Sequence, residues 1–325
     1  SSVLSLVGST PIVLLNRIFP HPRIKLAAKL EAKNVGGSIK DRVALAMIEA
    51  AEASGELTPD KTIIEATSGN TGVGLAMVCA VKGYKLTLVM PDSASEERKR
   101  IMRAYGAELL LTPGRLGTDG AIEEAYRLAR EEPHGYVLMD QYNNPASIAA
   151  HYRGTGQEIL EQTGGRVTHV VATLGTSGTA MGLAKRMKES APQVRVVAVE
   201  PYAGHRIQGL KNMQESYPPG IYDKHAVNRI IRVEDEEAFT RELLTGQPDA
   251  PSYFGRMKRV NRDGPPVLGQ RAPLQRLEAA DLAGRVNRDL VLIDTRPLAE
   301  QRRGVVPGSL SVPGGGSFAT YAAYA

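Results

Sequence analysis

The sequence has no tryptophan, one cysteine and only four phenylalanines in 325 residues. A single cysteine, Cys79, excludes an internal disulfide and a cysteine cluster for zinc or iron–sulfur centres, and it fits a reducing cytosol. The six histidines lack the HxxxH or HxH spacing of a metal site, so we expect no metal. The apolar runs are strand-length and interrupted by charge, so none should cross a bilayer. We therefore expect a cytoplasmic protein.

The net charge of +5 is concentrated at one end of the chain. Residues 246–325 hold 11 Lys and Arg against 7 Asp and Glu, which leaves 29 against 28 for residues 1–245. The surplus has no dense basic run with interleaved aromatics, so it indicates solvated surface and no nucleic-acid partner. The same segment holds 10 Gly and 8 Pro in 80 residues, which indicates a boundary near residues 240–246.

Short β-branched runs alternate with segments of helical period from residue 25 onward. The pattern predicts strands at 26–31, 62–67 and 84–90 and helices at 41–54, 70–82, 119–131 and 145–162. Repeated alternation of strands and helices is typical of an α/β fold with mostly parallel sheets and helices on both faces.

The first loop whose residues suit catalysis or binding is Asn34-Val-Gly-Gly-Ser-Ile-Lys40. It places a lone lysine at the start of a helix otherwise built from apolar and small residues. The positive end of a helix lowers the pKa of such an amine, which suits a nucleophile. An ordinary surface lysine is the alternative, and this loop alone favours it.

The second loop, Glu65-Ala-Thr67-Ser68-Gly69-Asn70-Thr71-Gly72, follows a predicted strand. Its hydrogen-bonding side chains and glycine-freed N–H groups suit a carboxylate at a helix N-terminus. A capping turn is the alternative, because Ser, Thr and Asn are also common N-caps. Four such residues exceed what one cap needs.

The third loop, Gly175-Thr176-Ser177-Gly178-Thr179, joins a predicted strand to a predicted helix. Small hydroxyl residues let backbone amides approach a phosphate, although a plain helix-starting turn is also possible. A lysine loop, a carboxylate cradle and a phosphate cradle are together what a pyridoxal-phosphate enzyme acting on an amino acid needs.

Seven ordered motifs extend over residues 7–239: VGSTPIV, NVGGSIKDR, EATSGNTG, DQYNNPAS, HYRGTGQEI, GTSGT and VEP. Together they resemble the B-type branch of the cysteine synthase family of fold-type II pyridoxal-phosphate enzymes. The resemblance implies a small cofactor and substrate lobe at 36–145 and a large, phosphate-binding, truncated lobe made of 1–35 and 146–240. It also implies a homodimer.

The resemblance implies a role for each matching residue. Lys40 would form the Schiff base with pyridoxal 5'-phosphate and then transfer protons, and Asn70 would bind the cofactor's ring hydroxyl. The cofactor phosphate would be held by Gly175, Thr176, Ser177, Gly178 and Thr179. The substrate carboxylate would be bound by Thr67, Ser68, Thr71 and Gln141.

The implied reaction is β-replacement on O-acetylserine or O-phosphoserine. Loss of the β-substituent would leave a bound aminoacrylate, to which sulfide or another sulfur donor adds to give cysteine. The stretch Gln208-Gly-Leu-Lys211-Asn-Met213 resembles the B-type enzymes, in which a basic residue faces the leaving group. Lys211 is therefore a candidate for preferring O-phosphoserine, with a solvated loop lysine as the alternative.

The family pattern stops after Phe239. The expected turn that meets the cofactor's pyridine nitrogen does not follow in the sequence. Instead, residues 241–325 resemble the tail of a metallo-β-lactamase-fold dioxygenase and the opening half of a rhodanese domain, without the metal-binding histidines or the nucleophilic cysteine. Two other interpretations stay open, namely an inactive fusion or truncated protein and a serine/threonine dehydratase-type or cystathionine-forming relative.

Overall fold

The computed structural model describes residues 2–17, 21–205, 207–215 and 217–234, together with two short strands near the C-terminus. The chain divides into two compact units, Ser1–Pro248 and Asp249–Ala325. In the second unit, β10 (Ile293–Asp294) pairs in parallel with β11 (Leu310–Ser311), and β10 lies within the LVLID run at 290–294. The predicted dioxygenase-like and rhodanese-like segments otherwise lie outside the described residues.

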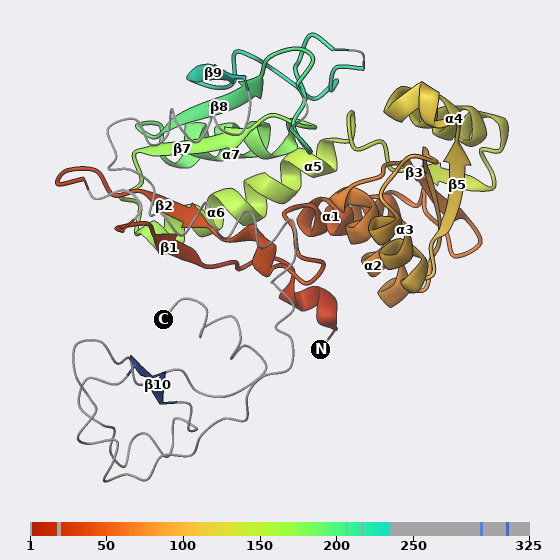
Figure 1. Cartoon of the computed structure of the whole chain (residues 1–325), viewed down its shortest axis with the longest axis horizontal. Helices are drawn as coiled ribbons and strands as arrows, with labels where there is room; N and C mark the ends of the chain where they lie inside the picture. The colour runs from red at the N-terminus through yellow and green to blue at the C-terminus, as the bar shows by residue number, and fades with distance from the viewer. Residues whose placement is uncertain are drawn as a thin grey trace, which may run out of the picture. The chain divides into compact units, whose positions relative to one another are not determined.

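A four-stranded parallel sheet forms one half of the first unit, in which Figure 1 labels β3 and β5. Its strand order is β5-β4-β3-β6. Its strands are rich in β-branched residues or leucine, and the two central strands are mostly buried. The four strands are β3 (Thr62–Ala66), β4 (Lys85–Pro91), β5 (Glu108–Thr112) and β6 (Tyr136–Leu138). The helices around this sheet are α1 (Lys40–Ser54), α2 (Asn70–Lys82), α3 (Glu96–Ala104) and α4 (Gly117–Glu131), with the short η3 (Gly114–Leu116) before α4.

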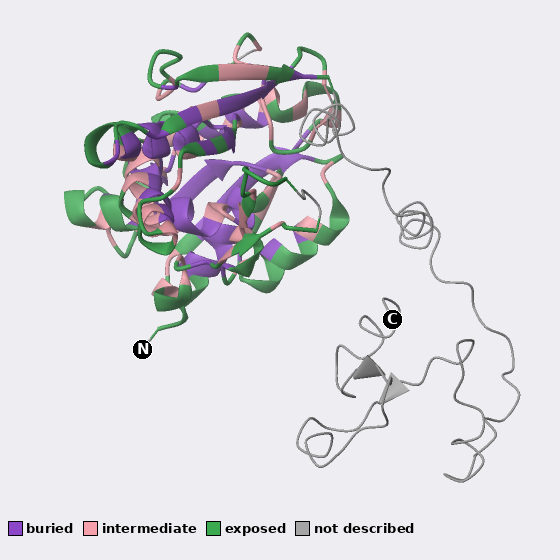
Figure 2. Ribbon diagram, turned by 90° about the vertical axis from the view of Figure 1, so that its left-hand side faces the viewer, coloured by how far each residue is buried: buried purple, intermediate pink, exposed green. Residues whose placement is uncertain are grey.

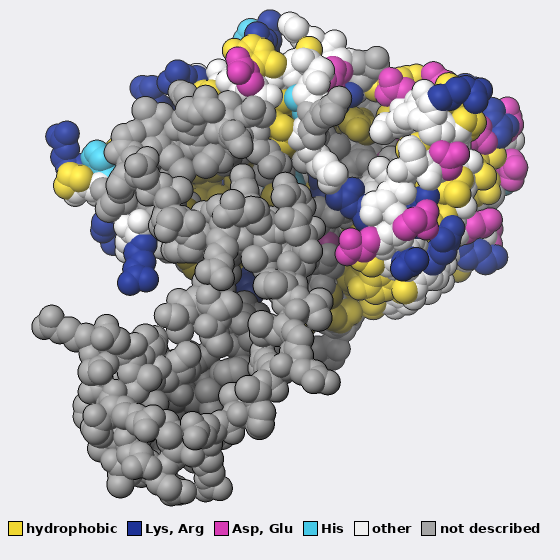
Figure 3. Space-filling view, in the orientation of Figure 1, with side chains coloured by type: hydrophobic (Ala, Val, Ile, Leu, Met, Phe, Trp, Pro, Cys, Tyr) yellow, Lys and Arg dark blue, Asp and Glu magenta, His cyan; other side chains and the backbone are white. Residues whose placement is uncertain are grey.

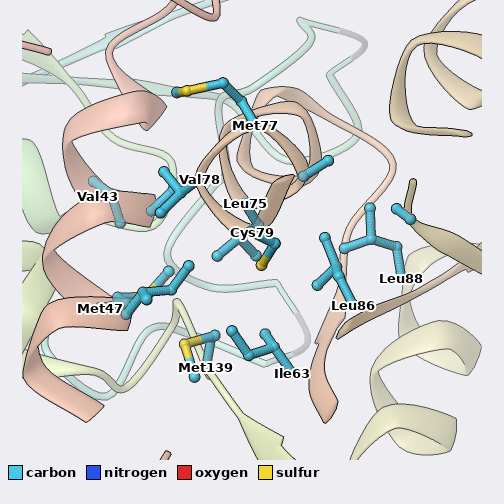
Figure 4. Close-up of a cluster of buried hydrophobic side chains, with 14 of the residues drawn as sticks. Val43, Met47, Ile63, Leu75, Met77, Val78, Cys79, Leu86, Leu88 and Met139 are labelled. Atoms are coloured by element: carbon cyan, nitrogen blue, oxygen red, sulfur yellow. The ribbon is translucent and has the colours of Figure 1, made fainter. Parts of the chain in front are cut away.

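Both faces of this sheet carry an apolar cluster. On one face, Ile63, Leu86 and Leu88 pack against α1 and α2, and Cys79 lies among them (Figure 4). On the other face, Ile64 and Val89 pack against the buried side of α4. Side chains alternate between the faces along each strand, so helices on both sides explain why β3 and β4 are buried almost throughout (purple in Figure 2).

The second sheet is parallel and has three described strands in the order β7-β8-β9. Its main apolar cluster joins β7 and β8 to α7. The strands are β7 (His169–Thr173), β8 (Arg195–Pro201) and β9 (Arg229–Val233), and the helices of this half are α5 (Pro145–Ala150), α6 (Gly156–Thr163) and α7 (Gly178–Ser190).

The N-terminal segment is held by a charged cluster. Arg42 of α1 forms ion pairs with Glu31 at 2.8 Å and with Glu158 of α6 at 2.6 Å, and Lys29 reaches Glu158 at 2.7 Å. Arg42 also donates to Thr10 Oγ1 at 3.1 Å. The cluster thereby ties the N-terminus to helices of both halves. The segment contains η1 (Val3–Leu6), β1 (Ile12–Leu14), β2 (Ala27–Lys29) and η2 (Glu31–Lys33).

The predicted α/β class with parallel sheets is confirmed, and two local predictions are wrong in detail. The strand predicted at 26–31 is only β2, which pairs antiparallel with β1 outside the parallel sheets. The helix predicted at 145–162 is interrupted by a π-helical turn, η4 (His151–Thr155). His151 Nδ1 lies 3.0 Å from Thr155 Oγ1 across this turn, and hydrophobic periodicity does not register such a contact.

Charged side chains of both signs are interspersed over the described surface around α3 and α4 (Figure 3). Within the described residues, no helix is long and apolar enough to cross a membrane. The described residues also contain no group of three or more His, Cys, Asp or Glu placed to hold a metal ion.

Candidate active site

Lys40 is the first residue of α1, and its side chain points toward the loop that precedes α7. Lys40 Nζ donates to Thr176 Oγ1 at 3.1 Å, across 136 residues of sequence. Burial of the amine lowers its pKa to about 8, so a larger fraction is neutral and nucleophilic at neutral pH than for an exposed lysine. Lys40 is therefore not an ordinary surface lysine.

The loop before Lys40 is closed by the neighbouring aspartate. Asp41 is fully buried, and its Oδ2 accepts from the N–H of Gly36 at 2.6 Å. A Cβ atom on Gly36 would lie 2.7 Å from Asp41 Oδ1, so a larger residue there would displace the Asp41 carboxylate. This contact holds the turn that brings Lys40 to the start of its helix.

Thr71 and Gln141 meet at the carboxyl ends of β3 and β6. Thr71 Oγ1 donates to Gln141 Oε1 at 2.7 Å, and Gln141 Nε2 lies 3.4 Å from Glu65 Oε1. All three residues are buried. Thr67 is also buried, and its Oγ1 accepts from the N–H of Gly69 at 3.2 Å. Ligands of open parallel sheets bind at this end of the strands.

The loop 175–179 joins β7 to α7 and brings backbone close to backbone. A Cβ atom on Gly175 would lie 2.3 Å from the carbonyl oxygen of Gly209, so this position requires glycine. Ser177 has a left-handed φ of 64° immediately before α7, and its buried Oγ has no hydrogen-bond partner among the described residues. A free hydroxyl beside a helix N-terminus suits a phosphate, so this loop fits a phosphorylated cofactor beside Lys40.

His151 contacts the loop 175–179 through Thr179. Its Nε2 lies 3.1 Å from Thr179 Oγ1, while its Nδ1 is occupied by Thr155. Burial lowers the pKa of His151 to about 3, so the ring is neutral and one nitrogen accepts while the other donates. The π-helical turn therefore serves to orient Thr179.

The other predicted residues lie around these contacts. Asn70 is the exposed first residue of α2, and the carbonyl oxygen of Ser68 is 3.5 Å from Arg98 Nη1. Lys211 donates its backbone N–H to the carbonyl of Leu174 at 2.9 Å, and its Nζ lies 6.0 Å from the centre of the Tyr142 ring. The structure thus places Lys211 beside residues that adjoin Gly175 and Gln141.

Three residues at the site were missed by motif analysis. Glu65 contacts Gln141, and His151 contacts Thr179. Arg98 lies between the Ser68 carbonyl oxygen and Gln208, with its Nη2 3.0 Å from Gln208 Oε1. Glu65 does leave a signal, because it is a carboxylate inside the apolar run TIIEAT. The other two depend on contacts between distant segments, which the sequence does not display.

The profile of the pyridoxal-phosphate dependent enzyme family matches residues 3–244. The chain belongs to this family, and the predicted enzyme class and cofactor are confirmed. Within the family it is similar to cysteine synthases. It is 47% identical over 248 residues to the cysteine synthase of Aquifex aeolicus (strain VF5), covering 74% of this chain and 76% of that protein.

Two further relatives agree. Cysteine synthase B of Escherichia coli (strain K12) is 44% identical over 245 residues, covering 75% of this chain and 80% of that protein. The crystal structure of cysteine synthase from Entamoeba histolytica superposes with a TM-score of 0.68 at 41% identity, covering 71% of this chain and 72% of that one. The predicted relationship to cysteine synthases is confirmed for this part of the chain, and the predicted resemblances of residues 241–325 stay predictions.

Proposed function

We propose that the protein catalyses β-replacement on O-acetylserine or O-phosphoserine, with sulfide or another sulfur donor, to give cysteine. The observation that carries the proposal is the contact of 3.1 Å between Lys40 Nζ and Thr176 Oγ1, which joins the lysine loop to the phosphate-type loop. The similarity to cysteine synthases supports the same reaction. When bound, pyridoxal phosphate supplies an electron sink that acidifies the α-proton of the amino acid.

The chain's own residues would position the cofactor. Lys40 would attach it covalently and then carry the α-proton, a task suited to an amine whose pKa is about 8. Asn70 would meet the ring hydroxyl. The phosphate would be held by the loop that His151 orients, formed by Gly175, Thr176, Ser177, Gly178 and Thr179.

The substrate would be bound from the first sheet. Its carboxylate would meet the hydroxyl, amide and N–H donors of Thr67, Ser68, Thr71 and Gln141, two of which already contact each other. Lys211 would face the leaving group, where its charge favours a phosphate over an acetyl group. These donors would also keep water from the reacting carbon once the carboxylate is bound.

The organisation that accompanies this function is proposed in the same terms. Residues 36–145 would move as a small lobe against a large lobe formed by 1–35 and 146–240, and two copies would form a homodimer. The protein would act in the cytoplasm.

The proposal is tested on the full chain loaded with pyridoxal phosphate. Borohydride should fix the cofactor on Lys40, as located by mass spectrometry, and the Lys40→Arg variant should carry no label. Adding O-acetylserine or O-phosphoserine with sulfide should release cysteine. Absence of a Lys40 adduct would show an inactive protein, while pyruvate and ammonia as the main products would show a dehydratase instead.

A further inference from the structure

Glu65 is a buried carboxyl group directly behind the proposed carboxylate site. It lies on β3 on the same face as Ile63 and is only 2% exposed. Its Oε1 contacts Gln141 Nε2, whereas its Oε2 has no hydrogen-bond partner among the described residues. Burying an unpaired carboxylate oxygen costs much free energy, because the oxygen shares a negative charge. Burying the unpaired carbonyl oxygen of a neutral carboxylic acid costs much less.

The surroundings of Glu65 also favour the neutral acid. Burial and the charge of Asp140 raise the pKa of Glu65 to about 8, and the N–H groups of Gln141 and Asp140 oppose this shift without cancelling it. Two tyrosines also interact with Glu65, namely Tyr126 of α4 and Tyr142, and burial raises the pKa of both. The ammonium of Lys211 stands 6.0 Å from the Tyr142 ring.

The proton on Glu65 determines which way the hydrogen bonds run toward the substrate. An ionised Glu65 can only accept, so Gln141 must turn its NH₂ toward it and its oxygen toward Thr71, which is the orientation that the amide has in the structure. The Thr71 hydroxyl then donates its hydrogen bond to Gln141 and presents only lone pairs to the substrate carboxylate, which these lone pairs repel. A neutral Glu65 can donate to the Gln141 oxygen, which turns the amide by half a revolution. The Gln141 NH₂ then faces Thr71, and the Thr71 proton is free for the substrate.

We infer that Glu65 is a positioning residue whose proton directs the Gln141–Thr71 pair to donate to the substrate carboxylate. The inference rests on the proposed function, because it assumes an amino-acid substrate at Thr71 and Gln141. It adds that the enzyme binds its substrate only with Glu65 protonated. Binding above about pH 8 is therefore coupled to the uptake of one proton by this group.

Calorimetry on the cofactor-loaded full chain tests this coupling. The probe is L-alanine, an amino acid without a β-leaving group, titrated between pH 7 and pH 10 in buffers of different ionisation enthalpy. The Glu65→Gln variant mimics the neutral acid permanently. Relative to this variant, the wild type should weaken by about tenfold per pH unit above pH 8 and take up about one more proton on binding. The titration of the alanine amine is common to both proteins and cancels.

Two controls separate positioning from folding. Glu200→Gln replaces the buried glutamate of β8, and it should leave the pH dependence as in the wild type. Asp140→Asn removes the neighbouring negative charge, so the midpoint should move to lower pH. Equal pH profiles for wild type and Glu65→Gln, or an unmoved midpoint in Asp140→Asn, would overturn the inference.

Infrared spectroscopy keeps this result distinct from the proposed function. The difference between wild type and Glu65→Gln should show a protonated carboxyl band at pH 7 that disappears with a midpoint near pH 8. Absence of that band would overturn the inference even in a protein that binds alanine. A protein that shows the band, but in which cofactor loading creates no alanine site, would overturn the proposed function and the substrate role of Glu65 with it.

Discussion

The two parallel sheets of the first unit differ in how they are covered. In the first sheet, β3 and β4 are buried almost throughout, because α1 and α2 cover one face and α4 covers the other. In the second sheet, β7 alternates between exposed and buried residues, and Val171 is 52% exposed among the described residues. Burial of side chains therefore stabilises β3 and β4 more than it stabilises β7.

Each sheet also contains a buried glutamate, and the two glutamates differ in the hydrogen-bond partners of their carboxylate oxygens. Glu200 of β8 has both oxygens occupied, since Oε1 accepts from the N–H of Met213 at 2.8 Å and Oε2 from Arg232 Nε at 3.2 Å. Glu65 of β3 has one oxygen without a partner among the described residues. A paired buried carboxylate is typical of structure, whereas an incompletely paired one at a site is a candidate for function.

The largest predicted effect concerns the link between the two halves. Arg42→Ala should destabilise the protein by about 3–5 kcal/mol, because it removes a buried guanidinium that pairs with partly buried Glu31 and Glu158, and it leaves only Lys29 to pair with Glu158. Burial alone would raise the pKa of Glu158, but hydrogen bonds from Arg42 and Lys29 hold it at about 2. Urea unfolding at pH 7 measures the loss.

The matched control is Lys82→Ala, which removes a more exposed pair with Glu52 and should cost about 1 kcal/mol or less. Equal losses for the two variants would show that the Arg42 cluster does not join the halves. Two separate unfolding transitions in Arg42→Ala would show instead that the halves are independent once it is gone.

A pair of core substitutions tests the difference between the sheets directly. Leu88→Ala in β4 removes a fully buried side chain and should cost about 2–5 kcal/mol. Val171→Ala in β7 removes a half-exposed side chain and should change stability by about 0.5 kcal/mol or less. Denaturant midpoints of the two variants give the comparison, and a large cost at Val171 would mean that its face is covered in the folded protein.

Much of the fold follows from patterns that are local in the sequence. The helices at 41–54 and 70–82 were predicted to within a residue of α1 and α2, because glycine in a left-handed conformation ends each one, at Gly55 and Gly83. The unequal covering of the sheets could not be predicted in the same way. The runs that form β3 and β7 are both apolar, and their difference arises from which helices pack on them.

The candidate site likewise contains residues that local sequence predicts and residues that depend on contacts between distant segments. Lys40 and the loop 175–179 were singled out from motifs, because each lies in a run of residues that are adjacent in the chain. Glu65 and His151 were not found, because their importance arises from burial and from partners in other elements, such as Gln141 and Thr179. A sequence motif shows which residues are present, but not the protonation state of a buried side chain.

The pH dependence of stability should distinguish the two buried glutamates. The pKa of Glu65 is about 8 in the folded protein, against about 4.5 for an ordinary glutamate, so the folded state binds the extra proton between these values. Stability should therefore fall as pH rises through this window, by up to about 1.4 kcal/mol per unit from this group alone. Glu65→Gln should remove this slope, whereas Glu200→Gln should retain it. Thermal unfolding at pH 5, 6, 7 and 8 measures the slopes, and parallel curves for all three proteins would contradict the assignment.

The smallest predicted effect concerns Lys211, in the loop between β8 and β9. Its partly exposed ammonium lies near the Tyr142 ring rather than in a buried ion pair, so Lys211→Ala should leave stability within about 0.5 kcal/mol. Loss of one cation from a phosphate contact should raise the KM for O-phosphoserine by about tenfold and leave the KM for O-acetylserine nearly unchanged. Lys211→Arg should retain the preference, because the charge remains. Equal losses on both donors would make Lys211 a solvated loop residue that contributes no substrate selectivity.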